Sequence, residues 1–88
     1  MESLHDTLFE HLKDEIEDAC EYLHKAEEAE KMEKHYLATG LHKIALDEYS
    51  HAHFIREYLI KKEMYHVHEH YHEVEARWHR LREKLGYE

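Results

Sequence analysis

The apolar positions of this chain form two long stripes with helical spacing. Steps of four and three residues keep one face of a helix turned toward a partner helix. The first stripe consists of Leu8, Leu12, Glu15, Ala19, Tyr22, Ala26 and Ala29. The second consists of Leu41, Ala45, Glu48, Ala52, Ile55 and Leu59. We therefore expect two helices that pack on each other along these stripes.

Residues that break helices are scarce, and their positions predict where the helices end. The chain has no proline and two glycines, Gly40 and Gly86. A glycine directly after a periodic run is typical of a helix C-cap. We therefore expect helix 1 over about 4–38, a turn at 39–41 and helix 2 over about 42–60. The predicted fold class is all-α, with an antiparallel two-helix hairpin as its main element.

The apolar register slips once in the last third of the chain. After Leu59 the stripe resumes one residue late, which turns the buried face of a continuous helix by about 100°. The resumed stripe consists of Ile60, Met64, Val67, Tyr71, Val74, Trp78, Leu81 and Leu85. We expect an extended or kinked C-terminal helix over about 61–85 that serves assembly. In this interpretation Tyr71, Trp78 and Leu81 lie at a subunit interface.

Two glutamates interrupt the apolar stripes. Glu15 lies in the first stripe and Glu48 in the second, and His51 follows Glu48 on nearly the same helix face. A buried carboxylate without a partner is costly, so its occurrence in both helices predicts a bound cation. The same Glu-x-x-His spacing starts at Glu21, Glu63 and Glu69, as expected by chance in a chain so rich in these residues, and Glu21 and Glu63 lie off the stripes.

Length, charge and composition exclude several functional classes. The chain has 88 residues and a formal net charge of −9, which argues against nucleic acid as a partner. No apolar run approaches the length needed to span a membrane, and the single cysteine, Cys20, excludes an internal disulfide. We expect one domain over residues 1–88 in a cytoplasmic protein. A hairpin this small leaves part of its stripes uncovered, so we expect a homodimer or a higher homo-oligomer.

The segment from Glu15 to Tyr22, Glu-Ile-Glu-Asp-Ala-Cys-Glu-Tyr, resembles the first helix of the ferritin-like superfamily, and of bacterioferritins and rubrerythrins in particular. In that pattern a ligand glutamate precedes a tyrosine by seven residues, and the Glu-x-x-His glutamate follows 33 residues after the first, as Glu48 follows Glu15. Those families supply this set twice within four helices, whereas residues 4–59 supply it once.

The resemblance therefore implies half of a ferritin-like bundle, which a second chain completes by dimerisation. The short encapsulated ferritins are two-helix chains that are similar in size and also assemble around shared metal sites. An enclosing protein shell within a cytoplasmic compartment stays open as an alternative setting.

The resemblance implies a di-iron centre shared between two chains. Glu15 would be a terminal ligand, Glu48 would bridge the two irons, and His51 would bind one iron through a ring nitrogen. Tyr22 would hydrogen-bond a bridging carboxylate, donate an electron, or serve only as an aromatic core residue. Oxygen ligands with imidazole suit iron or manganese, and zinc stays an alternative. We expect no haem, because Tyr49 stands where haem-binding bacterioferritins have methionine.

The implied activity is that of a ferroxidase, which oxidises Fe(II) with O₂ or peroxide for iron storage or detoxification. A rubrerythrin-like peroxide reductase is one alternative, although Cys20 alone cannot build a cysteine-ligated iron module. A metal-free adaptor, whose polar stripe residues set helix register, is another. A third is a non-catalytic metal buffer whose main site is the histidine-rich tail, with four donors on one predicted helix face: His66, Glu69, His70 and Glu73.

Overall fold

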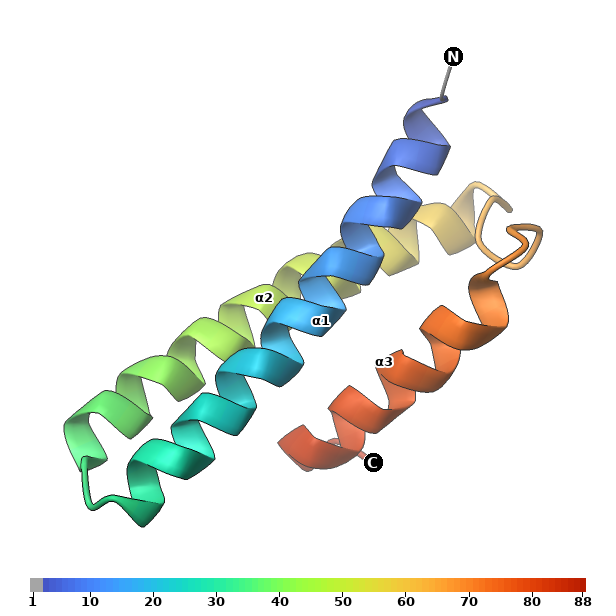
Figure 1. Cartoon of the computed structure of the whole chain (residues 1–88). Coiled ribbons are helices and arrows are strands. Elements are labelled where there is room, and N and C mark those ends of the chain that lie inside the picture. The colour runs from blue at the N-terminus through green and yellow to red at the C-terminus, as the bar shows by residue number, and fades with distance from the viewer. Residues whose placement is uncertain (1–2) are drawn as a thin grey trace.

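Three α-helices make up the computed structural model of the chain, which describes residues 3–88 (Figure 1). They are α1 (Leu4–Lys31), α2 (His35–Lys61) and α3 (Tyr71–Leu85). α1 and α2 form a long antiparallel hairpin, and α3 runs back along it. No strand occurs within residues 3–88, which confirms the all-α prediction. Nowhere in this part of the chain is a helix both long and apolar enough to cross a membrane.

The first turn lies earlier in the chain than the sequence predicts. After α1, Glu33 takes the left-handed conformation with a φ of 59°. The amide of Lys34 then donates a hydrogen bond of 2.9 Å to the carbonyl of Ala29, which closes the helix in a Schellman motif. The turn therefore occupies residues 32–34, and the predicted turn at 39–41 is wrong.

Gly40, which suggested that turn, lies in the interior of α2. α1 ends at Lys31 rather than near residue 38, and α2 begins at His35 rather than near residue 42. The physical reason is that a glutamate, Glu33, occupies the left-handed position that glycine usually takes. A search for glycine therefore could not find this helix end.

The slip in the apolar register marks a true break between α2 and α3. α2 ends at Lys61, close to the predicted end near residue 60. Glu63 has a φ of 57°, and the amide of Met64 bonds the carbonyl of Leu59 at 2.9 Å, so this helix ends as α1 does. Residues 62–70 contain turns and no helix, and the C-terminal helix is a separate element rather than an extension of α2.

α3 buries its apolar stripe in the core of its own chain. The exposed fraction of Trp78 is 2% and that of Leu81 is 0%. The Trp78 ring stacks on Tyr49, with 4.9 Å between the ring centroids, and Tyr71 packs half-buried against the same core. The predicted subunit interface is therefore wrong for Trp78 and Leu81, whereas for the half-buried Tyr71 it stays a prediction. The chain reversal at residues 62–70 lets this helix fold back onto the hairpin instead.

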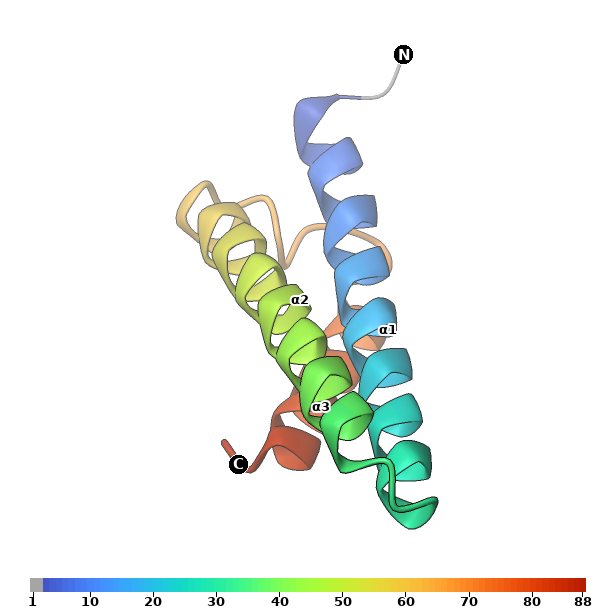
Figure 2. The same ribbon diagram turned by 90° about the vertical axis from the view of Figure 1, so that its left-hand side faces the viewer.

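α3 covers one side of the hairpin and leaves the other side open. Seen from the left of Figure 1, α1 and α2 lie in front and α3 lies behind them (Figure 2). On the covered side the guanidinium of Arg56 donates hydrogen bonds of 3.0 and 2.7 Å to the Glu75 carboxylate. We use the term open face for the uncovered side, which carries Leu37, Ile44 and His51 at seven-residue steps along α2.

We expect Gly40→Ala to stabilise the protein by about 0.5–1 kcal/mol, because alanine is the better helix former in a helix interior. A methyl group at Gly40 would meet no heavy atom within 4 Å. Urea unfolding followed by circular dichroism measures the change. Gly86→Ala is the matched control and should destabilise, because Gly86 has a φ of 83° at the end of α3. If Gly40→Ala instead destabilised the protein, that result would support the predicted turn at 39–41.

Candidate metal centre

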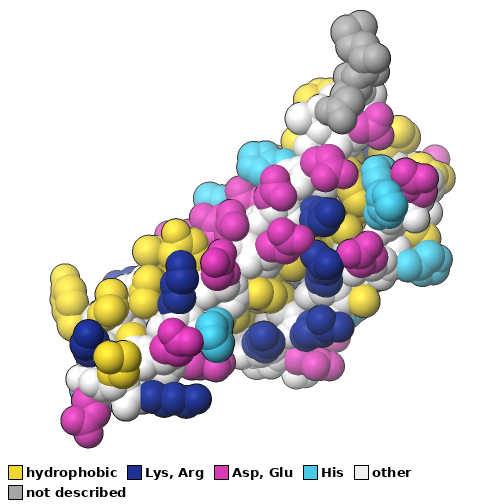
Figure 3. Space-filling view, in the orientation of Figure 1, with side chains coloured by type: hydrophobic (Ala, Val, Ile, Leu, Met, Phe, Trp, Pro, Cys, Tyr) yellow, Lys and Arg dark blue, Asp and Glu magenta, His cyan; other side chains and the backbone are white. Residues whose placement is uncertain are grey.

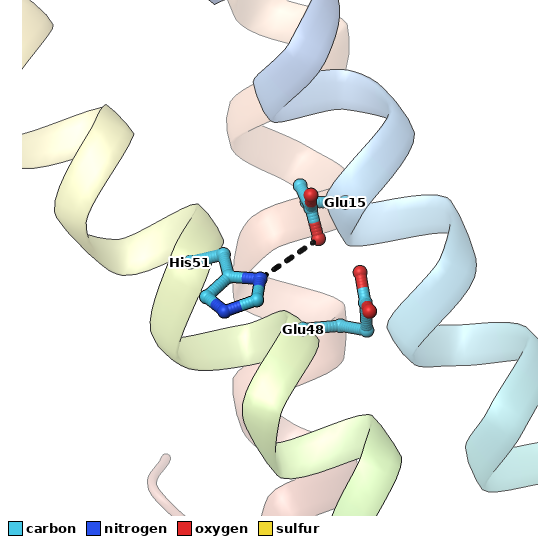
Figure 4. A group of neighbouring side chains, drawn as sticks. All are labelled: Glu15, Glu48 and His51. Atoms are coloured by element: carbon cyan, nitrogen blue, oxygen red, sulfur yellow. Dashed lines mark ion pairs between the residues drawn. The ribbon is translucent and has the colours of Figure 1, made fainter.

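The two stripe glutamates and the histidine meet between α1 and α2 (Figure 4). Glu15 comes from α1, whereas Glu48 and His51 come from adjacent turns of α2. One ligand atom of each residue lies within 4.8 Å of the ligand atoms of the other two. Within residues 3–88 no other three donors of this kind come together. The structure thus brings the three predicted ligands together, and metal binding by them stays a prediction.

Small residues beside the glutamates let α1 and α2 approach closely at this point. Ala19 lies one turn after Glu15, and Ala45 and Ala52 lie on either side of Glu48 along α2. All three alanines have an exposed fraction of 0%. Because the separation of packed helices depends on the side chains at the contact, larger residues here would move the carboxylates apart.

Glu15 is well shielded from solvent, whereas its neighbour His51 is not. The Glu15 side chain is 13% exposed and the His51 side chain 60% exposed, with 3.6 Å between Glu15 Oε2 and His51 Nδ1. While Glu48 is ionised, the buried Glu15 Oε2 has no hydrogen-bond partner in the described part of the chain. A buried polar atom without a partner costs about 1–3 kcal/mol and is rare in folded proteins. A cation bound by the three side chains would supply the missing interaction.

The surroundings of Glu48 favour its protonated form. A hydrogen bond with Glu15, together with burial and repulsion from the Glu15 carboxylate, raises the pKa of Glu48 from 4.5 to about 7. Asp18 adds to this repulsion, and the nearby His51 acts in the opposite direction. Two adjacent carboxyl groups tend to share one proton because both cannot ionise at low cost. A cation that binds here would replace that proton.

His11 lies next to the site, and the stripe pattern did not identify it. His11 precedes Glu15 by one helical turn, and its Nε2 lies 3.0 Å from Glu15 Oε1. The His11 side chain is 58% exposed. The spacing of four residues between a histidine and a glutamate was a usable signal. This signal is weak, because His24 and Glu28 have the same spacing on the exposed surface, with 2.9 Å between His24 Nε2 and Glu28 Oε1.

Tyr22 lies half-buried against the core, two helical turns after Glu15. The Nζ atom of Lys25 lies 5.7 Å from the centroid of the Tyr22 ring. This packing suits an aromatic core residue, which was one of the alternatives for this position. A catalytic role of Tyr22 stays a prediction.

The histidine-rich tail does not form the predicted helix face, because α3 begins only at Tyr71. His66 and His70 lie in the turns of residues 62–70, where the His66 ring meets Tyr71 edge-on with 5.2 Å between centroids. His70 Nε2 lies 3.3 Å from Glu69 Oε1 in the same segment. Within residues 3–88 no group of three donors includes any of the four predicted tail ligands, His66, Glu69, His70 and Glu73.

Comparisons with protein families, with curated proteins and with solved structures gave no match to this chain. The resemblance to the ferritin-like superfamily therefore stays a prediction.

We expect Glu48→Gln to stabilise the metal-free protein above pH 7. The pKa of Glu48 is about 7 in the folded chain and 4.5 as a free side chain, so the folded state binds more protons between these values. The stability that Glu48 contributes is complete below pH 4.5 and is lost as the pH rises to about 7. Glutamine mimics the protonated carboxyl group at every pH and avoids this loss, which is on the order of 2 kcal/mol.

Urea unfolding with a chelator present, at pH 5 and at pH 8, measures this effect. The gain in stability of the variant over the parent should be clearly larger at pH 8 than at pH 5. Glu57→Gln, at an exposed position of the same helix, is the control and should show no such pH-dependent difference. An equal stability difference at both pH values would contradict a raised pKa of Glu48.

Proposed function

We propose that this chain is a ferroxidase that binds and oxidises Fe(II) at a di-iron centre formed between two copies. The convergence of Glu15, Glu48 and His51 from two helices, with a buried carboxylate oxygen that lacks a partner in the described structure, is the observation that supports it. Two carboxylates and an imidazole fit iron or manganese better than metals that prefer thiolates. In this proposal iron is the substrate of the protein.

Three donors per chain leave coordination positions open, and a second copy can fill them. Pairing of two chains about a two-fold axis would place four carboxylates and two imidazoles around two ions. In this arrangement Glu48 would be shared by the two ions, and Glu15 and His51 would each hold one of them. Each chain then contributes half of the ligand set.

The open face has the apolar character that such a pairing needs. Leu37 is 48% exposed and Ile44 is 39% exposed, and both share a side of α2 with His51. Phe54, one turn beyond His51, is 72% exposed. Hydrophobic side chains also gather near the hairpin end of the molecule in the space-filling view (Figure 3). A second hairpin on this face would cover these residues and complete a four-helix bundle.

The side chains would supply binding, orientation and proton exchange. Glu48 would release its proton when iron binds, so that both carboxylates are ionised in the loaded centre. Iron supplies the redox chemistry: two Fe(II) each give up one electron, and hydrogen peroxide takes both, with two protons, to become two water molecules. A metal buffer based on the histidine-rich tail has less support, because no group of three donors forms there in the described structure.

We expect anaerobic loading to give about one Fe(II) per chain and rapid oxidation on exposure to O₂ or peroxide. Glu48→Ala should abolish both, because it removes the proposed bridging ligand. Iron binding is measured by equilibrium dialysis and oxidation by absorbance in the near ultraviolet. Glu21→Ala is the matched control, since Glu21 and His24 have the same Glu-x-x-His spacing on an exposed part of α1. Loss of uptake in His66→Ala but not in Glu48→Ala would instead support the tail as the main site.

We expect Ile44→Glu to weaken the dimer at least about tenfold, because a charge would be buried at the pairing face. Iron uptake should fall with it while the helix content of the monomer is retained. Analytical ultracentrifugation and circular dichroism measure these two properties. Val67→Glu is the control, since Val67 is 73% exposed in the α2–α3 connection and lies outside the open face. A parent protein that is monomeric with iron bound would contradict the shared centre.

A further inference from the structure

The two oxygens of the Glu15 carboxylate have different surroundings. Oε1 lies 3.0 Å from His11 Nε2. Oε2 is buried without a hydrogen-bond partner in the described structure and lies 3.6 Å from His51 Nδ1, the contact drawn as a dashed line in Figure 4. One oxygen is therefore occupied by a neighbour on the same helix, and the other is turned toward the candidate ligands of α2.

We propose that His11 is a positioning residue, which holds Oε1 of Glu15 so that Oε2 faces the metal position. This inference rests on the proposed function of the site. An ionised carboxylate only accepts hydrogen bonds, so Nε2 of His11 carries the proton that faces Oε1. Carboxylates that bind metals are commonly held by such a second partner, and loss of that partner typically lowers metal affinity about 10–100-fold.

A glutamate needs such a restraint more than a histidine ligand does. Its long side chain has several rotatable bonds, and a carboxylate that is free to turn presents either oxygen. The contact with His11 selects one orientation before any ion arrives. Preorganisation of this kind raises affinity because less freedom is lost on binding.

The chain itself contains a matched pair that lacks this role. His24 Nε2 lies 2.9 Å from Glu28 Oε1 at the same four-residue spacing, and the Glu28 side chain is 60% exposed. The pairing as such is thus a product of helix geometry. The pair of His11 and Glu15 differs because its glutamate is only 13% exposed and has a second oxygen among the candidate ligands.

Anaerobic titration of the full chain with Co(II), followed by its visible absorption, tests the proposal. We expect His11→Ala to weaken Co(II) binding about 10–100-fold with an unchanged number of ions per chain. His11→Gln should recover part of the loss, because its amide N–H can reach the same oxygen. His24→Ala should match the parent protein in both affinity and spectrum. Because His11 is exposed, circular dichroism should show an intact fold in all variants.

Two results would overturn the positioning role. One is a His11→Ala affinity equal to that of His24→Ala, which would make the contact incidental. The other is a fall in the number of ions per chain, which would make His11 a ligand itself. Glu48→Ala separates this failure from failure of the proposed function. If Glu48→Ala binds Co(II) as well as the parent, the centre itself is wrong, and the role of His11 falls with it.

Discussion

The carboxyl groups of Glu15 and Glu48 meet where α1 packs on α2, and this contact sets the chemistry of the candidate site. Each carboxyl group takes a place in an apolar stripe. The hydrogen bond between them, burial and charge repulsion raise the pKa of Glu48 to about 7, so the pair retains a proton. Once both groups are ionised, Glu15 Oε2 is buried without a partner in the described structure. Apolar residues at the same two positions would avoid these costs. Buried polar groups that cost stability are typical of binding sites, where a ligand provides the compensation.

α3 determines which side of this contact remains accessible. A bare hairpin would expose apolar residues on both sides, but Trp78 and Leu81 close one of them, and the Arg56–Glu75 pair joins the two elements. The backbone of α3 approaches α1, and side chains such as Trp78 reach α2. A partner helix that packed on the open face would lie beside the candidate ligands. In the proposed dimer, pairing on this face would also complete the proposed centre.

The sequence predicted the features that depend on periodicity and failed where one residue broke a general rule. The stripe of α2 identified its packed face, and the register slip located the break after Lys61. The stripe of α1 was right only in part, because it omitted Phe9, Ile16 and Leu23, which are buried. The first turn was missed because Glu33 adopts a conformation usually left to glycine. The burial of Trp78 within its own chain was missed because periodicity gives the apolar side of a helix and not the partner that covers it.

The same distinction explains why one Glu-x-x-His pair forms a candidate site and the others do not. Helix geometry brings a glutamate and a histidine three or four residues apart together wherever they occur, as with His24 and Glu28. In this structure the third donor, Glu15, comes from another helix, and its approach requires small residues at the contact. Ala19, Ala45 and Ala52 satisfy that requirement around Glu48. The packing of α1 on α2 thus decides which Glu-x-x-His pair forms a candidate site, and the spacing of the two residues alone does not.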